Sequence, residues 1–218
     1  MKGRLTTSKI MQCILLALLP AGVHGVFRYG WNAGLIILIT CLTAVVTEFL
    51  LEKIMKKPVR VGDLRVLVTG LIMSYCLPPT VSWYIGAIAG GMCALIMMLS
   101  TQFFERNVLS PVILTRLILM YAFSAEMSTY MFDGLTMATP LNVFKADGAV
   151  NTLAMIFGNT GGCIGETSTI LLCAGAIFLI MMGIMDFRVT GMYLFSFAAF
   201  MAVFGGHGLS SYYLTTHL

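Results

Sequence analysis

The chain has 218 residues, of which 59% are hydrophobic and only 10% are charged, and its formal net charge is +4. A soluble domain carries roughly 25% charged residues, so this chain has too few polar side chains to cover a globular surface. The composition excludes an ordinary soluble enzyme and predicts an all-α integral membrane protein.

Seven apolar stretches predict about seven transmembrane helices, since a span needs about 20 mostly apolar residues. The third stretch is short and is expected to stop at Pro78-Pro79, because proline lacks a backbone donor and restricts the residue before it. The fourth carries Gly86, Gly90 and Gly91, which permit close helix packing. We expect a single domain over residues 1–218, with spans near 10–27, 33–51, 64–81, 83–103, 108–123, 167–184 and 189–204.

Basic residues gather before the first span and in the loop that follows the second. Short cytoplasmic loops collect Lys and Arg, so the bilayer explains this clustering better than a nucleic-acid partner does. The N-terminus and the basic loop are therefore expected in the cytoplasm, and the long connector at residues 124–165 outside. The residues concerned are Lys2, Arg4 and Lys9, then Lys53, Lys56, Lys57, Arg60 and Arg65.

A short internal similarity links the third and sixth spans. Gly62-Asp63 precedes the third and Gly165-Glu166 precedes the sixth, and an aromatic-led helix follows each at similar spacing. The expected topology sends these spans in opposite directions, as in an inverted repeat, whose binding sites lie near the repeat interface. Alternatively, the two carboxylates only complement the positive ends of helices.

The remaining polar and sulfur-containing side chains do not suggest a metal site. None of the six cysteines forms a CxxC pair, so we expect ordinary packing and no iron–sulfur or zinc centre. Glu48, Arg116 and Glu126 are predicted near span ends, where long charged side chains reach the membrane surface.

The connector contains a threonine in an unusual setting. Thr139 precedes Pro140 within Asp133-Gly134-Leu135-Thr136-Met137-Ala138-Thr139-Pro140-Leu141. The proline biases Thr139 to an extended backbone, which leaves its hydroxyl clear of helix hydrogen bonds. Such a hydroxyl can carry a phosphoester, although a Thr-Pro pair in a loop is in itself ordinary.

Several motifs, in order along the whole chain, resemble the D subunits of Rnf electron-transport complexes and the related B subunits of sodium-pumping NADH:quinone reductases. The chain ends at Leu218, earlier than the resemblance leads us to expect, so we expect a shortened variant, a fragment or an incomplete gene product. The matching motifs are Lys9-Ile10-Met11, Val61-Gly62-Asp63, Val68-Thr69-Gly70-Leu71, Leu77-Pro78-Pro79-Thr80 and Ile164-Gly165-Glu166-Thr167-Ser168.

The resemblance implies covalent FMN. In that family the last threonine of a Ser/Thr-Gly-Ala-Thr motif, commonly followed by Pro-Leu, is esterified to the phosphate of FMN. Here the stretch reads Thr136-Met137-Ala138-Thr139-Pro140-Leu141, with Met137 in place of the glycine. The expected attachment residue is Thr139, and the expected surroundings are Asp133, Thr136, Ala138 and Pro140.

A second site is expected at Gly165-Glu166-Thr167, where a carboxylate and a hydroxyl lie at a helix start. They can hold the edge of an isoalloxazine, for a second and non-covalent flavin, or a coupling cation. A capping arrangement without a ligand is the alternative.

The resemblance also implies a role in a complex of the bacterial inner membrane. The chain would relay electrons between iron–sulfur and flavin subunits, with coupled movement of Na⁺ or H⁺, after a flavin transferase has attached the FMN. No acid–base constellation is visible, so no catalytic residues are expected. The alternatives are a flavin-free inverted-repeat transporter or channel, and a structural assembly subunit.

Overall fold

A computed structural model describes residues 6–56, 64–103, 110–132, 135–136, 161–166 and 168–204. Apart from two strands of two residues each, the regular elements in these residues are helical. They are α1 (Thr7–Tyr29), α2 (Trp31–Ile54), α3 (Arg65–Tyr75), α4 (Trp83–Phe103), α5 (Pro111–Ala122), α6 (Ser124–Met127), β1 (Met131–Phe132), β2 (Leu135–Thr136), the 3₁₀ helix η2 (Ile164–Glu166), α9 (Thr169–Met181) and α10 (Phe187–Phe204).

These elements confirm the expected all-α membrane protein. Among the described residues, α1, α2 and α4 are long and apolar enough to cross a membrane, and four further apolar helices are shorter. Large apolar side chains are widely exposed, among them Phe27 at 85% and Met181 at 82%, as expected of a surface that faces lipid. The chain is thus a multi-pass membrane protein, and its seven spans remain a prediction.

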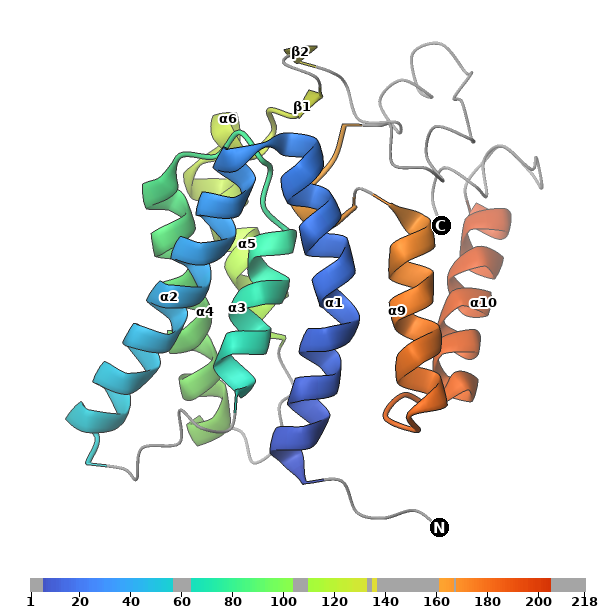
Figure 1. Ribbon diagram of the computed structural model, residues 1–218, viewed down its shortest axis with the longest axis horizontal. Coiled ribbons are helices and arrows are strands. Elements are labelled where there is room, and N and C mark those ends of the chain that lie inside the picture. The colour runs from blue at the N-terminus through green and yellow to red at the C-terminus, as the bar shows by residue number, and fades with distance from the viewer. Residues whose placement is uncertain are drawn as a thin grey trace.

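The helices lie side by side and alternate in direction (Figure 1). In that view α2, α4 and α9 run downward, and α1, α3, α5 and α10 run upward. The short elements α6, β1 and β2 lie at the upper end, where the connector starts. This arrangement agrees with the expected alternation, because the start of α1 and the end of α2 share one side and the connector begins on the other.

The boundaries differ most from expectation around the first turn and the third helix. A single residue, Gly30, separates α1 from α2, and its φ of 78° is a conformation that glycine adopts at little cost. Helix α3 has 11 residues and ends at Tyr75, before Pro78 and Pro79, which have no N–H to continue the ladder. The third span is therefore an incomplete helix, as the prolines predict.

Close contact between α2 and α4 forms the centre of the bundle. A Cβ added at Gly86 would lie 3.2 Å from the Thr40 hydroxyl, and one at Gly90 would collide with the Thr40 carbonyl. The Thr40 hydroxyl itself donates to the Ile36 carbonyl at 2.7 Å, so this buried polar group is satisfied within its own helix. The expectation that these glycines permit close packing is confirmed for Gly86 and Gly90.

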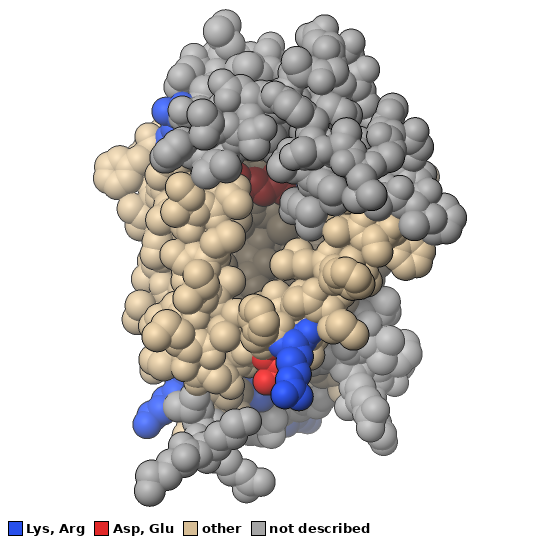
Figure 2. All heavy atoms as spheres, turned by 90° about the vertical axis from the view of Figure 1, so that its right-hand side faces the viewer, with Lys and Arg blue, Asp and Glu red and all other residues tan. Residues whose placement is uncertain are grey.

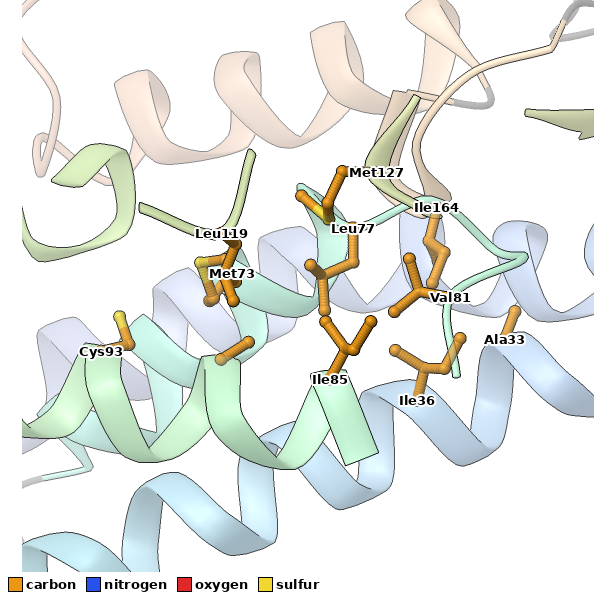
Figure 3. Packing of buried hydrophobic residues seen from close by; sticks show 11 residues of the cluster. Ala33, Ile36, Met73, Leu77, Val81, Ile85, Cys93, Leu119, Met127 and Ile164 are labelled. Carbon is orange, nitrogen blue, oxygen red and sulfur yellow. The ribbon is translucent and has the colours of Figure 1, made fainter. Parts of the chain in front are cut away.

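The main core lies toward the connector end of the bundle. Figure 3 shows Ile36, Val81 and Ile85 gathered near Leu77 and Ile164. Residues of α2, of α4 and of the turn between α3 and α4 thus pack with the segment that leads into α9. The buried cluster comprises Ala33, Ile36, Met73, Leu77, Val81, Ile85, Ala89, Cys93, Leu119, Met127 and Ile164.

Candidate functional site

The candidate site lies where the end of α3 meets the segment that precedes α9. Beyond Tyr75 the chain turns through Pro78, and the Leu77 carbonyl is left to accept the Ile164 amide at 3.1 Å. The Asn32 amide group donates to the Pro79 carbonyl at 2.8 Å and fixes this turn to the start of α2. Backbone groups released by the broken helix are thus paired inside the protein.

Small residues allow this junction to form. A Cβ at Gly165 would lie 2.5 Å from the Tyr75 Cβ, and one at Gly25 would lie 2.6 Å from the Ile164 carbonyl oxygen. Both distances are below ordinary carbon contact, so glycine is required at each position unless the neighbouring segment shifts. The Tyr29 hydroxyl adds a hydrogen bond to the Gly162 carbonyl at 3.3 Å. Helix α1 therefore supports residues 162–165 along its last two turns.

The side chain and the backbone amide of Glu166 both form hydrogen bonds with Cys163. Its Oε2 accepts the Cys163 amide at 3.2 Å, while the Glu166 amide donates to the Cys163 carbonyl at 3.0 Å. The side chain is exposed, although Gly165 and Cys163 beside it are buried. An exposed carboxylate held by a backbone donor can accept a further N–H or contact a cation. On the face formed by α9 and α10, Figure 2 shows a hollow with an acidic residue at its upper edge.

Arg116 points into the junction from α5. Its Nη2 donates to the Cys163 sulfur at 3.4 Å. The Glu166 carboxylate is close enough to act electrostatically on Arg116. The guanidinium thus connects α5 with the segment that precedes η2, near the end of the connector.

Burial keeps the polar neighbours of Arg116 in their neutral forms. It raises the pKa of the Cys163 thiol to about 12, and the Glu166 carboxylate contributes to this rise. Burial likewise raises the pKa of the Tyr130 hydroxyl. Arg116 therefore donates to a neutral thiol rather than to a thiolate.

A second group of contacts fixes the beginning of the connector to the start of α4. Glu126 accepts the Ser82 hydroxyl at 3.0 Å and the Tyr84 hydroxyl at 2.8 Å. These bonds hold the pKa of the Glu126 carboxyl below its usual value, Tyr84 having the larger effect. The Thr80 hydroxyl donates to the Thr129 carbonyl at 2.6 Å.

The predicted site residues divide between described and undescribed parts of the chain. Gly165 and Glu166 lie in η2 at the junction, and Thr136 lies in β2, where it pairs with Met131. Their roles in binding stay predictions. The residues that lie outside the described residues are Asp133, Ala138, Thr139, Pro140 and Thr167, together with Asp63 of the suggested repeat.

Sequence reasoning missed the role of two charged residues. Arg116 and Glu126 were expected to reach the membrane surface, but they contact Cys163 and the Ser82–Tyr84 turn instead. More than one helical turn separates Arg116 from each end of the apolar helix α5, which is a signal that its charge has a partner in the protein. Within the described residues no group of three or more His, Cys, Asp or Glu side chains is arranged to hold a metal ion.

Comparison with known proteins is consistent with these features. The model of the NQR2, RnfD, RnfE family matches residues 1–218. The chain is 37% identical over 192 residues to the D subunit of the proton-translocating ferredoxin:NAD(+) oxidoreductase complex of Clostridium ljungdahlii, an alignment that covers 80% of this chain and 58% of that protein.

Two further relatives are likewise longer than the region that this chain matches. The D subunit of the Na(+)-translocating ferredoxin:NAD(+) oxidoreductase complex of Acetobacterium woodii is 31% identical over 94% of this chain and 67% of its own length. The D subunit of the ion-translocating oxidoreductase complex of Stutzerimonas stutzeri is 28% identical over 85% of this chain and 64% of its own. The matched region thus spans 58% to 67% of the length of these three relatives.

Proposed function

This chain belongs to the NQR2, RnfD, RnfE family, and we propose that it serves as a membrane subunit of an ion-translocating ferredoxin:NAD⁺ or NADH electron-transport complex. In this role it relays electrons through FMN esterified to Thr139. The observation that carries the proposal is the family match over the whole chain, combined with Thr139-Pro140-Leu141 in its connector.

The chain's own part is to hold the connector beside the membrane bundle. A bound flavin supplies one- and two-electron redox chemistry, and the protein supplies its position and surroundings. The contacts of Thr80, Glu126 and Tyr29 fix residues on both sides of the proposed attachment stretch to α1, α4 and the turn between α3 and α4. They support a fixed geometry at the base of the connector.

The proposal includes a second ligand position at Gly165-Glu166-Thr167. The exposed Glu166 carboxylate suits an N–H at the edge of a non-covalent flavin, or a coupling cation. Support comes from the junction itself, because irregular backbone inside a membrane bundle is typical of places where a ligand or ion binds.

Partners and orientation follow from the same role. Iron–sulfur and flavin subunits would exchange electrons with this chain, and a flavin transferase would modify Thr139. The bacterial inner membrane is the expected location. The cytoplasmic side would be the end where α1 begins, because Lys9, Lys53 and Arg65 lie at that end of their helices (Figure 1).

A flavin-free transporter of inverted-repeat type is the second candidate. The short helices α3 and α9 run in opposite directions, as the two halves of such a repeat would (Figure 1). An assembly subunit without its own cofactor would share this fold.

Covalent flavin separates these candidates. The chain is co-expressed with a flavin transferase, and its band on a denaturing gel is viewed under ultraviolet light. We expect fluorescence in the wild type and in Thr152→Ala, which changes another connector threonine outside the motif. We expect a dark band of equal membrane yield in Thr139→Ala. Fluorescence retained by Thr139→Ala would refute the assigned attachment residue.

A further inference from the structure

A groove lies between α1, α2 and the first turn of α3. Helices α1 and α2 meet at the Gly30 turn and diverge away from it (Figure 1). The space between them holds a cavity of about 540 Å³ that is open on one side. The residues that line it include Val26 from α1, Gly34, Leu38, Cys41 and Val45 from α2, and Leu67 from α3.

The groove has an apolar lining. The described residues that form it are aliphatic apart from Gly34 and Cys41, and a cysteine in such surroundings behaves as a small hydrophobe. An ordered water needs two to four polar partners, which this lining does not offer. Because Leu38 and Leu42 at the groove are 63% and 60% exposed, the groove opens onto the surface that faces lipid.

The dimensions of the groove fit one acyl chain. The stretch of α2 from Gly34 to Val45 is about 16 Å long, at the helical rise of 1.5 Å per residue. One leaflet of the hydrocarbon core is about 15 Å deep. A cavity of about 150 Å³ holds the six carbons of benzene, so about 540 Å³ has room for about 20 carbons. A helix of a partner protein, about 10 Å across, would need about twice this volume over the same length.

Trp31 marks the end of the groove that is nearer to the membrane surface. It lies one turn before Gly34 on the same face of α2 and is 83% exposed. Tryptophan is enriched at the membrane–water interface, because its ring is apolar and its indole N–H reaches polar groups. The Trp31 indole is therefore placed to donate to a phosphate or ester oxygen of a lipid whose chain enters the groove.

We propose that this groove binds one acyl chain of a phospholipid from the connector-side leaflet, with the lipid head group beside Trp31. The chain contacts α1 at Val26, α2 at Cys41 and α3 at Leu67, so it fills the space where these helices diverge. The site is separate from the junction at Glu166, and the proposal does not depend on the electron relay.

Native mass spectrometry of the whole chain tests this proposal. The protein is extracted from its membrane in mild detergent, and any lipid that stays bound is counted and identified by fragmentation. Gly34→Leu introduces a side chain into the groove, and its Cβ would have only ordinary contact with Val26, at 3.5 Å. The matched control is Gly191→Leu in α10, where nothing lies within 4 Å of an added Cβ.

We expect wild type and Gly191→Leu to retain a single phospholipid per chain. Gly34→Leu should retain about tenfold less, which is the loss of affinity expected when about two methylenes of the acyl chain lose their burial. Val45→Phe narrows the other end of the groove and should act in the same direction. It covers the case in which Gly34→Leu does not fold.

Thermal unfolding provides a second readout. A ligand that binds only the folded chain raises its unfolding temperature. Dioleoyl phosphatidylglycerol, added to delipidated protein in detergent, should raise the unfolding temperature of wild type and of Gly191→Leu, and should leave that of Gly34→Leu unchanged.

Equal retention of phospholipid by wild type and by folded Gly34→Leu and Val45→Phe would overturn the proposal. An equal loss in Gly191→Leu would also overturn it, because the retained lipid would then not be specific to the groove. An isoprenoid quinone as the retained molecule would overturn it as well, since the occupant would not be an acyl chain.

Discussion

The Ile164 amide donates a hydrogen bond to the Leu77 carbonyl at 3.1 Å and so joins the end of α3 to the segment that precedes α9. These two residues also belong to one buried cluster (Figure 3). The bond links the two parts of the chain whose Gly-carboxylate motifs suggested a repeat. It places the second motif, Gly165-Glu166, beside the end of α3.

Gly165 is expected to be essential for this contact. An added Cβ would meet the Tyr75 Cβ at 2.5 Å, so Gly165→Ala must push η2 away from α3. We predict a loss of about 1–3 kcal/mol in the free energy of unfolding, as for other overpacked sites. Thermal or SDS unfolding in detergent measures it. The control is Gly191→Ala in α10, where nothing lies within 4 Å. Equal stability of the two variants would contradict the tight junction.

Glu126 is expected to make folding sensitive to acid. Hydrogen bonds from Tyr84 and Ser82 hold its carboxyl pKa below the usual 4.5. A lowered folded-state pKa contributes stability that is present above the unfolded value and is lost as pH falls through the folded value. Wild type should therefore unfold at a higher temperature than Glu126→Gln at about pH 6, and this difference should shrink by about pH 3.

Tyr84→Phe serves as the control for this prediction, since it removes the hydroxyl that lowers the Glu126 pKa most. It should reduce the pH dependence without removing the carboxylate. A temperature difference between wild type and Glu126→Gln that stays constant over this acid range would argue against a paired Glu126.

Cys163 is expected to resist alkylation in the folded protein. Its thiol is buried, and burial raises its pKa to about 12, so the reactive thiolate is scarce at neutral pH. The native protein is treated with N-ethylmaleimide, then denatured and treated with an isotopically heavy form. Mass spectrometry should find mainly the heavy label on Cys163. Complete light labelling before denaturation would contradict its burial beneath Arg116.

The membrane fold was predictable because its signals are local. Apolar length located each of the longer helices that the structure describes, and Pro78-Pro79 predicted the incomplete third one. The short β1–β2 pair was missed, although the Asp133-Gly134 dipeptide that lies between the two strands in sequence favours a tight turn.

The junction was only partly predictable, since its contacts join residues far apart in the sequence. Gly165 and Glu166 stood out because they head an apolar helix. Arg116 did not, because nothing in the sequence indicates that Cys163, 47 residues later, lies beside it. A basic residue inside an apolar helix signals a partner but does not identify it.

The proposed electron relay depends on FMN esterified to Thr139. The most direct test is mass spectrometry of the tryptic peptide from residue 117 to residue 145, taken from protein co-expressed with a flavin transferase. We predict a mass increase equal to FMN less one water, with fragment ions that place it on Thr139. An unmodified peptide, from a preparation in which the corresponding protein of a relative is flavinylated, would contradict it.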